Sequence, residues 1–304
     1  MKLSKSQSAI LALVLANMIW GAAPPVFKWA LSDIHPYTLA FLRFIVPPLL
    51  MLPFMKGHLK VNKKDYLNVF VAGFLGITVN IAFFFHGLLK APSINAALIA
   101  SSAPIFLILY SLVFLCRKER PKRKLVTGSL VGLVGVTVVL GAPLVLDGKI
   151  AAVGNLYYLF AMLGSATAVI LMRKMMKRNS PYAITFWTFI TGSIGFVPFF
   201  IQEVGEYGFL PNINLHGIVG LTFGIFFSSL IAYFLQTFAL KYLTAADVGV
   251  FTYIDPVITI LVAVPLLGEF PDTTFVVGSV LVILGILLAE GRLHYHPFHL
   301  FLKK

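Results

Sequence analysis

The sequence predicts an all-α integral membrane protein whose ten transmembrane helices form two inverted five-helix repeats. Three observations support this fold class: a very apolar composition, a succession of apolar runs of spanning length, and a second half that repeats the first. The chain has 304 residues, of which 59% are hydrophobic and 12% are charged. A soluble globular protein has about twice that charged fraction. Such a chain cannot cover a water-facing surface with polar side chains, so we expect lipid to surround it.

Apolar runs of spanning length follow one another along the whole chain. A membrane-spanning helix needs about 20 mainly apolar residues. The predicted spans are 9–29, 36–54, 66–87, 93–115, 125–142, 151–172, 182–201, 216–240, 246–268 and 274–291. The first run is too long for the core of a signal peptide, so we interpret it as a span and not as a cleaved leader.

The basic residues predict which side of the membrane each loop faces. If the spans alternate in direction, 20 of the 24 Lys and Arg residues fall on the side of the N-terminus, 3 fall on the other side, and Arg43 lies inside a span. The positive-inside rule then places both termini in the cytoplasm, in a cell (inner or plasma) membrane. The net charge of +13 does not indicate a nucleic-acid partner, because the basic residues lie in short gaps between apolar runs.

The two halves of the chain align with each other. Pro36 matches Pro181, which lies 145 residues later. Leu88 matches Leu240 and Pro104 matches Pro256, both at an offset of 152 residues, and Glu119 matches Glu269 at an offset of 150. Matches at Pro and Glu are not explained by a shared excess of apolar residues. Five helices are an odd number, so the second repeat is inverted, as in many secondary transporters. The predicted repeats are residues 1–142 and 151–291, followed by a cytoplasmic tail, 292–304.

Several short motifs, taken in order, resemble the EamA family of the drug/metabolite transporter superfamily. They are Trp20-Gly21, Arg43, Pro104, Asp255-Pro256, Gly268-Glu269 and the glycine-rich fifth and tenth spans. The resemblance implies a ten-helix fold that moves small metabolites, often amino acids and usually outward. Ser165 departs from the family pattern, because its counterpart in the first half is Trp20. The family has many substrates, so the resemblance names none.

Arg43 and Asp255 are charged residues predicted to lie inside spans. Their repeat counterparts are Thr188 and Ala103, so the repeated fold does not itself require a charge at either place. A charged group inside a span is costly and usually faces a cavity or a partner. A rise of about 1.5 Å per residue places the two groups within about 5 Å of each other in depth. Two interpretations stay open: a structural or gating ion pair, or a site for the substrate or a proton.

Other candidates for substrate binding or gating also fall at mid-depth. Pro104 and Pro256 each interrupt a helix, either as plain kinks or as breaks that line a cavity. The polar and aromatic candidates are Asn17, Trp20, Asn80, Tyr158, Trp187, Tyr233 and Tyr253. Interfacial anchoring and interhelical hydrogen bonding are the competing explanations for such residues.

Glycines in the fifth and tenth spans predict a close helix contact. They are Gly128, Gly132, Gly135, Gly278 and Gly285. Their pattern fits an interface within one chain and equally a homodimer, and both alternatives stay open. A second cluster, in the tail, comprises His294, His296 and His299, whose spacing suits neither face of a helix. We therefore predict an ordinary charged tail there and no metal site.

Motifs of enzymes and of ATP sites are absent from the sequence. There is no P-loop, no Gly-x-Ser-x-Gly turn and no His-Glu-x-x-His helix. We therefore predict no cofactor and no enzymatic activity, but a secondary transporter that exports amino acids or related amphipathic solutes by alternating access, with protons as a candidate coupling ion. The alternatives are a multidrug or a nucleotide/sugar-type transporter of the same fold, and an intramembrane lipid-modifying enzyme, which would need paired acids or a His–acid dyad.

Overall fold

The structure is a computed structural model, and it is helical throughout its described part. The described residues are 4–55, 59–103, 105–106, 123–145, 149–210, 213–243, 248 and 251–290. No strand occurs among them. Three predicted features lie outside this part: Pro104, most of the second half of the fourth span, and the tail with its histidines.

The first half of the chain folds into helices that follow the predicted spans. They are α1 (Lys5–Ala30), α2 (Pro36–Met51), η1 (Leu52–Phe54), η2 (Lys63–Asp65), α3 (Tyr66–Gly73), η3 (Phe74–Val79), α4 (Asn80–Leu88), α5 (Ser93–Ser101) and α7 (Arg123–Val145). Local signals set several boundaries. Ser4 and Gln7 form a capping box at the start of α1, and Pro36 opens α2, where its missing N–H costs nothing.

The second half folds into a similar succession of helices. Its helices are α8 (Lys149–Met175), α9 (Pro181–Ile194), α10 (Val197–Tyr207), α11 (Leu215–Thr222), η4 (Phe223–Ile231), α12 (Ala232–Leu240), η5 (Phe251–Tyr253), α14 (Ile254–Leu267) and α15 (Thr273–Glu290). Each predicted span therefore contains helix. The helix α14 ends at Gly268, whose φ of 67° suits glycine.

Four helices of the described part are long and apolar enough to cross a membrane. They are Lys5–Ala30, Lys63–Leu88, Ile150–Met175 and Leu215–Leu240, and the pair α9–α10, which is bent by 50°, makes a fifth if it is one span. Four of the other predicted spans correspond to shorter apolar helices in the described residues. In the remaining one, 93–115, the described residues contain the nine-residue helix α5. The outer surface carries large apolar side chains: Leu67 is 72% exposed and Leu261 is 66% exposed. Such a surface belongs in lipid, so the protein is a helical membrane protein.

Two irregular helical segments occur at matching places in the two halves. The π-helix η3 covers residues 74–79, and adding the repeat offset of 152 gives 226–231, which lies within the π-helix η4. The sequence analysis did not predict either segment. A π-helix inserts one extra residue into a turn, and such turns are frequent at functional sites.

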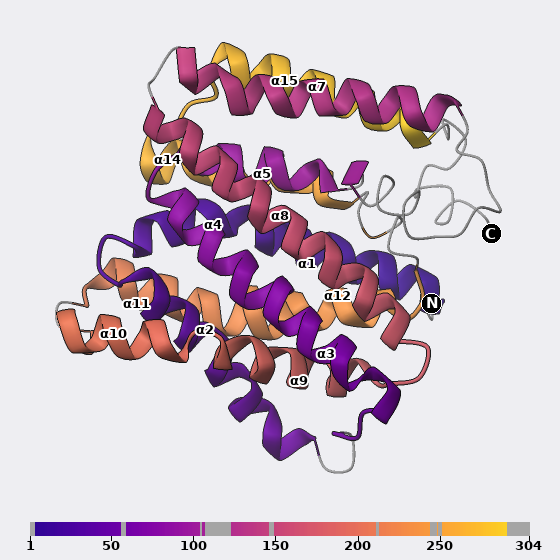
Figure 1. Cartoon of the computed structure of the whole chain (residues 1–304), viewed down its shortest axis with the longest axis vertical. Coiled ribbons are helices and arrows are strands. Elements are labelled where there is room, and N and C mark those ends of the chain that lie inside the picture. The colour runs from indigo at the N-terminus through magenta and orange to yellow at the C-terminus, as the bar shows by residue number, and fades with distance from the viewer. Residues whose placement is uncertain are drawn as a thin grey trace.

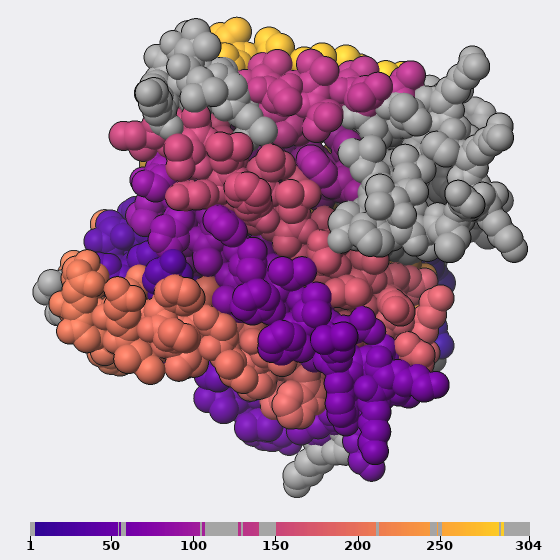
Figure 2. Space-filling model, in the orientation of Figure 1, coloured from indigo at the N-terminus to yellow at the C-terminus, as the bar shows by residue number. Residues whose placement is uncertain are grey.

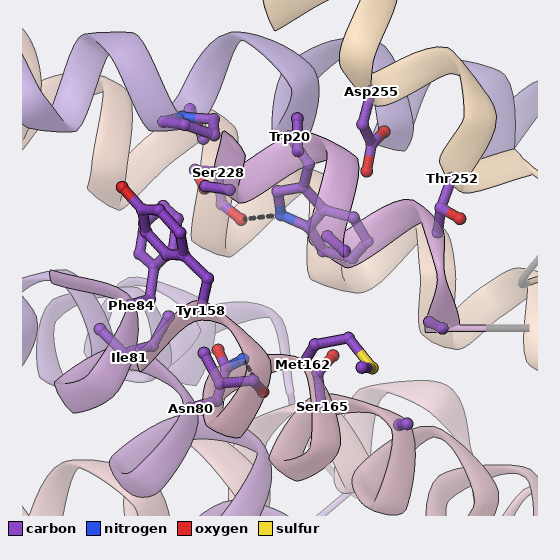
Figure 3. Close-up of a pocket in the computed structure, with 18 of the residues that line it drawn as sticks. Trp20, Asn80, Ile81, Phe84, Tyr158, Met162, Ser165, Ser228, Thr252 and Asp255 are labelled. Atoms are coloured by element: carbon purple, nitrogen blue, oxygen red, sulfur yellow. Dashed lines mark hydrogen bonds between the residues drawn. The ribbon is translucent and has the colours of Figure 1, made fainter. Parts of the chain in front are cut away.

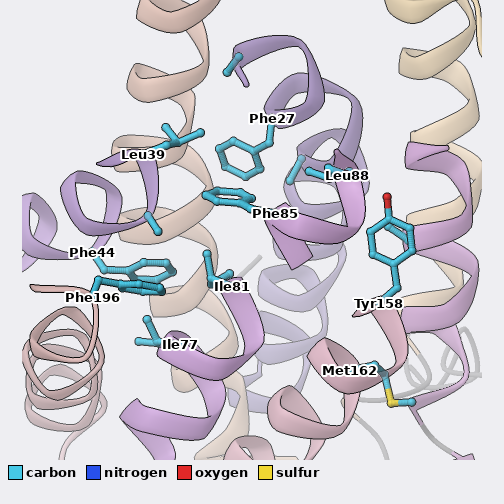
Figure 4. Packing of buried hydrophobic residues seen from close by; sticks show 14 of the residues in the cluster. Phe27, Leu39, Phe44, Ile77, Ile81, Phe85, Leu88, Tyr158, Met162 and Phe196 are labelled. Atoms are coloured by element: carbon cyan, nitrogen blue, oxygen red, sulfur yellow. The ribbon is translucent and has the colours of Figure 1, made fainter. Parts of the chain in front are cut away.

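The buried core combines aromatic and aliphatic side chains from both halves (Figure 4). Phe27 packs edge-on against Phe85 with ring centres 5.3 Å apart, and Phe44 packs in the same way against Phe189 at 5.4 Å. All four rings are fully buried. This packing fixes α1 and α2 against α4 and α9 and so positions the helices of the site described below.

The helices α7 and α15 lie side by side along one edge of the molecule (Figure 1). A Cβ atom built on Gly135 would lie 2.7 Å from the backbone nitrogen of Val282 and 2.8 Å from the carbonyl oxygen of Gly278. A Cβ on Gly285 would likewise collide with the backbone of Gly132. The predicted glycine contact is therefore formed within the chain.

Figure 2 shows one face of the molecule, to which α10, α3, α4, α8 and α7 contribute side by side.

Candidate functional site

A cavity of about 180 Å³ lies between helices of both halves (Figure 3). Side chains from α1, α2, α4, α5, α8, α12 and α14 line it. Six of the predicted site residues are among them: Trp20, Arg43, Asn80, Tyr158, Tyr233 and Asp255. A second hollow of about 270 Å³ is lined almost wholly by Leu, Ile, Met and Phe side chains between α2 and α12. It offers little that could recognise a polar solute, so we treat the first cavity as the candidate site.

Trp20 is held in place by the irregular helix η4. Its indole N–H donates a hydrogen bond to the carbonyl oxygen of Ser228 at 3.0 Å (Figure 3). Its ring meets the ring of Tyr233 edge-on, with centres 5.2 Å apart. The π-helical turn thus supplies an acceptor that fixes an aromatic side chain in the cavity wall.

Arg43 is a buried cation in the same wall, with only 2% of its surface exposed. Its Nε donates to the hydroxyl of Ser229 at 3.0 Å, and its Nη2 donates to the hydroxyl of Ser228 at 2.8 Å. The guanidinium carbon lies 4.4 Å from the centre of the Phe27 ring and 4.8 Å from that of Phe44. Two hydroxyls and two aromatic faces therefore hold the group.

Asp255 projects from the first turn of α14, and its side chain is buried. One of its carboxylate oxygens has no hydrogen-bond partner among the described residues. The ion pairs found in the described part are Lys28–Glu269, Arg178–Asp65 and His216–Asp33. An ion pair between Arg43 and Asp255, one of the two interpretations of these residues, is therefore not formed in this structure. Ser228 and Ser229 bind two of the guanidinium nitrogens instead.

Asn80 and Tyr158 join α4, α5 and α8 beside the cavity. The amide of Asn80 donates to the carbonyl oxygen of Ala161 at 2.6 Å. The hydroxyl of Tyr158 donates to the carbonyl oxygen of Pro92 at 3.2 Å. Both residues line the cavity and also tie neighbouring helices together, so the two interpretations of such residues are not exclusive.

Three predicted residues do not line the cavity. Asn17 is buried and donates to the carbonyl oxygen of Leu13 in its own helix at 2.8 Å. Trp187 is 37% exposed and donates to the carbonyl oxygen of Leu59 at 2.8 Å. Tyr253 packs against the cluster of residues between α5, α7 and α15. Their helices turn these side chains away from the cavity.

The predicted helix break at Pro256 has a specific form. Pro256 lies in the first turn of α14, where backbone N–H groups have no partner within the helix in any case. The turn before it is the 3₁₀ helix η5. The break is thus a change of helix type just before the proline, and it lies beside Thr252 and Asp255 in the cavity wall.

Several cavity residues escaped the sequence analysis, although the repeat contained a signal for them. Ser165 is the counterpart of Trp20, Ile81 is that of Tyr233, and all of these line the cavity. Applying the repeat offsets to Trp20 and Tyr233 would have found Ser165 and Ile81. Ser228, which binds both Trp20 and Arg43, lacked such a signal, because its counterpart Gly76 is not in the wall.

Equivalent positions in the two halves differ in polarity at four places in the cavity wall. At the offset of 152, the first-half residue is apolar and the second-half residue carries a polar group in the pairs Ile81 and Tyr233, Phe84 and Gln236, Ala100 and Thr252, and Ala103 and Asp255. Figure 3 shows Ile81 and Phe84 on one side of Trp20, and Thr252 and Asp255 on the other. The cavity can therefore hold a solute that is itself amphipathic.

Comparison with known proteins gives the family of the chain. The sequence profile of the EamA-like transporter family matches residues 7–141 and, a second time, residues 152–290. The chain belongs to the EamA-like transporter family. The resemblance found in the sequence is thereby confirmed, and this EamA protein is a membrane transporter.

Relatives of this EamA protein extend over nearly its whole length. An uncharacterized transporter of Archaeoglobus fulgidus is 26% identical over 298 residues, covering 93% of this chain and 98% of its own. An S-adenosylmethionine uptake transporter of Rickettsia bellii is 25% identical over 302 residues, covering 95% and 96% of the two chains. A solved crystal structure matches 96% of this chain and 100% of its own with a TM-score of 0.66 and 21% identity, which shows a shared fold.

Proposed function

We propose that this EamA protein is a secondary transporter that exports small amphipathic metabolites, foremost amino acids, by alternating access. The observation that carries the proposal is the cavity between the two halves, whose wall combines apolar side chains such as Ile81 and Phe84 with polar ones such as Thr252 and Asp255. Such a lining suits a solute with one apolar and one polar end, because ligand sites place a few polar groups in an apolar wall.

The size of the cavity suits a small solute. Its volume is about 180 Å³, and an apolar protein cavity of about 150 Å³ holds benzene. Ile81 and Phe84 can contact a ring or an alkyl chain, while Thr252 and Asp255 can contact a polar group. An amino acid with an apolar side chain meets both requirements.

For the architecture we propose ten membrane-spanning helices in two inverted repeats, residues 1–142 and 151–291, with both termini and the tail 292–304 in the cytoplasm of a cell (inner or plasma) membrane. The paired π-helices, the twofold family match and the equivalent cavity positions support a repeat. Two inverted units can exchange conformations, which would open the cavity to either side in turn. A reporter fused after Lys304 that is active only outside the cytoplasm would contradict this topology.

The energy for transport would come from a gradient or from exchange. Asp255 is the acidic residue of the described cavity wall and is our candidate for carrying a coupling proton. A single carboxylate does not supply the paired acids of an intramembrane hydrolase or transferase, which favours transport over catalysis.

A second candidate function is uptake of S-adenosylmethionine. The motivation is the printed activity of the Rickettsia relative, which covers nearly the whole of both chains. That solute carries an amino-acid group, so it shares recognition chemistry with the first candidate but reverses the direction.

Counterflow in proteoliposomes tests both candidates. Purified protein is reconstituted, and labelled leucine, phenylalanine, lysine and S-adenosylmethionine are each exchanged against the same unlabelled solute inside. We expect saturable flux of at least one of them without ATP. If the direction is export, cells that express the protein should also tolerate toxic amino-acid analogues better than cells that do not. Folded protein that moves none of the four would contradict the proposal.

A further inference from the structure

We propose that Arg43 is an anion-binding group, and that the transported solute carries a carboxylate or a similar anion that binds its free nitrogen. This inference rests on the proposed function, because it assigns a ligand chemistry to the same cavity. Arg43 is among the residues that line the cavity, and its Nη1 is buried and has no hydrogen-bond partner among the described residues. An anion would therefore reach this nitrogen when the cavity opens in the transport cycle. The other two nitrogens of Arg43 are held by Ser229 and Ser228. The guanidinium is thus fixed with one nitrogen unused.

The charge of Arg43 lacks a counterion in the structure. No carboxylate of the described residues lies within ion-pairing distance of it. A buried, unpaired cation is unfavourable in a membrane protein unless something compensates it. The faces of Phe27 and Phe44 compensate part of the charge, but a planar guanidinium binds a carboxylate far more specifically, through parallel hydrogen bonds. An anion entering the cavity would supply the missing partner.

Comparison of the repeats shows that the fold does not need this arginine. Its counterpart Thr188 donates its hydroxyl to the carbonyl oxygen of Ile184 in its own helix at 2.7 Å. The two serines that hold Arg43 have Gly76 and Ile77 as counterparts, which offer no hydroxyl. Arg43 from the first half thus contacts Ser228 and Ser229 from the second half. The equivalent positions, Thr188, Gly76 and Ile77, carry neither the arginine nor the serines, as expected of a recognition group and not of a repeated structural element.

Paired probes that differ only in the anion test the inference. They are benzoate against benzamide and phenylalanine against phenylalaninamide, measured by calorimetry and by thermal stabilisation of the full-length protein in detergent. We expect the carboxylate member of at least one pair to bind about tenfold or more tightly than its amide. Arg43→Gln should abolish this preference, and Arg43→Lys should keep part of it, because Lys retains the charge but not the planar donors.

A second arginine serves as the matched control. Arg178 pairs with Asp65 away from the cavity, so Arg178→Gln should leave the preference unchanged. If Arg43→Gln does not fold, the double variant Ser228→Ala, Ser229→Ala keeps the charge but releases the guanidinium, and it should reduce the preference several-fold.

The outcomes separate this inference from the proposed function. Equal binding of acid and amide in both pairs, no binding in either pair, or a preference that survives Arg43→Gln in folded protein, each overturns the inference. Flux in proteoliposomes without any carboxylate preference would leave the transport function standing and remove only the role of Arg43. A preference that depends on Arg43 without flux would keep the anion site and contradict the transport function.

Discussion

Lys28 and Glu269, which are 241 positions apart in the chain, meet at one end of the molecule with 2.6 Å between Nζ and Oε1. The second carboxylate oxygen of Glu269 accepts hydrogen bonds from the backbone N–H of Ser93 at 2.7 Å and from its hydroxyl at 2.6 Å. Lys28 also donates to the carbonyl oxygen of Ala91 at 2.9 Å. This one carboxylate therefore ties together the ends of α1, α5 and α14, three helices that line the cavity.

We expect Glu269→Gln to loosen the cavity at this end. Glutamine keeps one acceptor but loses the charge-assisted bonds, which are about twice as strong as neutral ones. In a Cys116→Ser background, a cysteine in place of the cavity residue Ala97 should react faster with a membrane-impermeant maleimide added on the side of Lys28. We expect the substitution to destabilise the arrangement in which Glu269 holds the three helices together by about 1–2 kcal/mol. Labelling should then be roughly fivefold to thirtyfold faster.

Glu206→Gln is the matched control for that experiment. Glu206 is an exposed residue of α10, so its substitution changes the net charge equally but breaks no contact with α1. Equal labelling rates for the two variants would show that the carboxylate of Glu269 does not hold the helices together.

The glycine contact between α7 and α15 predicts a difference between two Gly→Ala substitutions. A Cβ atom on Gly135 would meet backbone atoms at 2.7 and 2.8 Å, and backbone atoms cannot move aside as a flexible side chain can. We expect Gly135→Ala to cost about 1–3 kcal/mol and to lower Tm in detergent by about 2–4 °C for each kcal/mol.

Gly205→Ala provides the control, because nothing lies within 4 Å of a Cβ at that position. Gly205 is in the interior of α10, where alanine is favoured over glycine by about 0.5–1 kcal/mol. Its Tm should stay the same or rise slightly. A Gly135→Ala protein as stable as Gly205→Ala would mean that α7 and α15 are not packed as closely as described.

Asp33 predicts a pH dependence of stability. Its carboxylate accepts hydrogen bonds from the backbone N–H groups of Gly217 at 2.9 Å and of Asn214 at 3.2 Å, at the start of α11. The bond from Gly217 is the main cause that lowers the pKa of Asp33, and burial opposes it. Because the folded pKa lies below that of the unfolded chain, the stabilisation is complete above the unfolded value of about 3.9 and is lost as the pH falls through the folded value.

The measurement compares Tm of the wild type and of Asp33→Asn across pH. The wild type should be the more stable protein near neutral pH, and the difference should shrink as the pH falls below the unfolded value of about 3.9 and then through the lowered pKa of folded Asp33. A difference that persists at the lowest pH would show that the carboxylate charge at Asp33 does not stabilise the fold.

The sequence predicted the order of helices well, because apolar runs of this length have few other structures open to them. It predicted the site less completely, and Asn17 and Asn80 show why. Both are asparagines of the middle part of a predicted span, but Asn17 bonds within its own helix, whereas Asn80 reaches α8 at the cavity. The rotation of a helix about its axis depends on its neighbours, and an almost uniformly apolar helix records little of that rotation in its sequence.

The absence of an ion pair between Arg43 and Asp255 could not be predicted from the sequence, for a related reason. Counting residues gives depth along the membrane normal but not lateral position, so two charges at similar depth need not touch. The π-helix η4 was also invisible to the sequence analysis, since its extra residue per turn leaves no pattern of residue types. That segment supplies Ser228 and Ser229, which hold the guanidinium in place. The sequence thus predicted which charged residues lie in the cavity wall, but not which groups they contact.

The last prediction concerns Asp255→Asn, which removes the charge and the titratable proton but keeps the size and one acceptor. Because Asp255 and Arg43 form no ion pair here, the substitution strands no cation, and it removes a buried carboxylate that has an unsatisfied oxygen. We expect Tm to stay the same or rise, while flux falls at least about tenfold, equivalent to 1.4 kcal/mol, if Asp255 binds the solute or a proton.

Stability of the double variant Arg43→Gln, Asp255→Asn separates this expectation from the ion-pair alternative. Breaking a buried pair on one side costs about 3–5 kcal/mol, and removing the second partner recovers much of that loss. We expect no such recovery, because Arg43 bonds to Ser228 and Ser229 and not to Asp255. An Asp255→Asn protein that is strongly destabilised, and is rescued by Arg43→Gln, would show that the two residues pair in another conformation. Unchanged flux in Asp255→Asn alone would instead remove Asp255 from the site and leave Arg43 as its charged group.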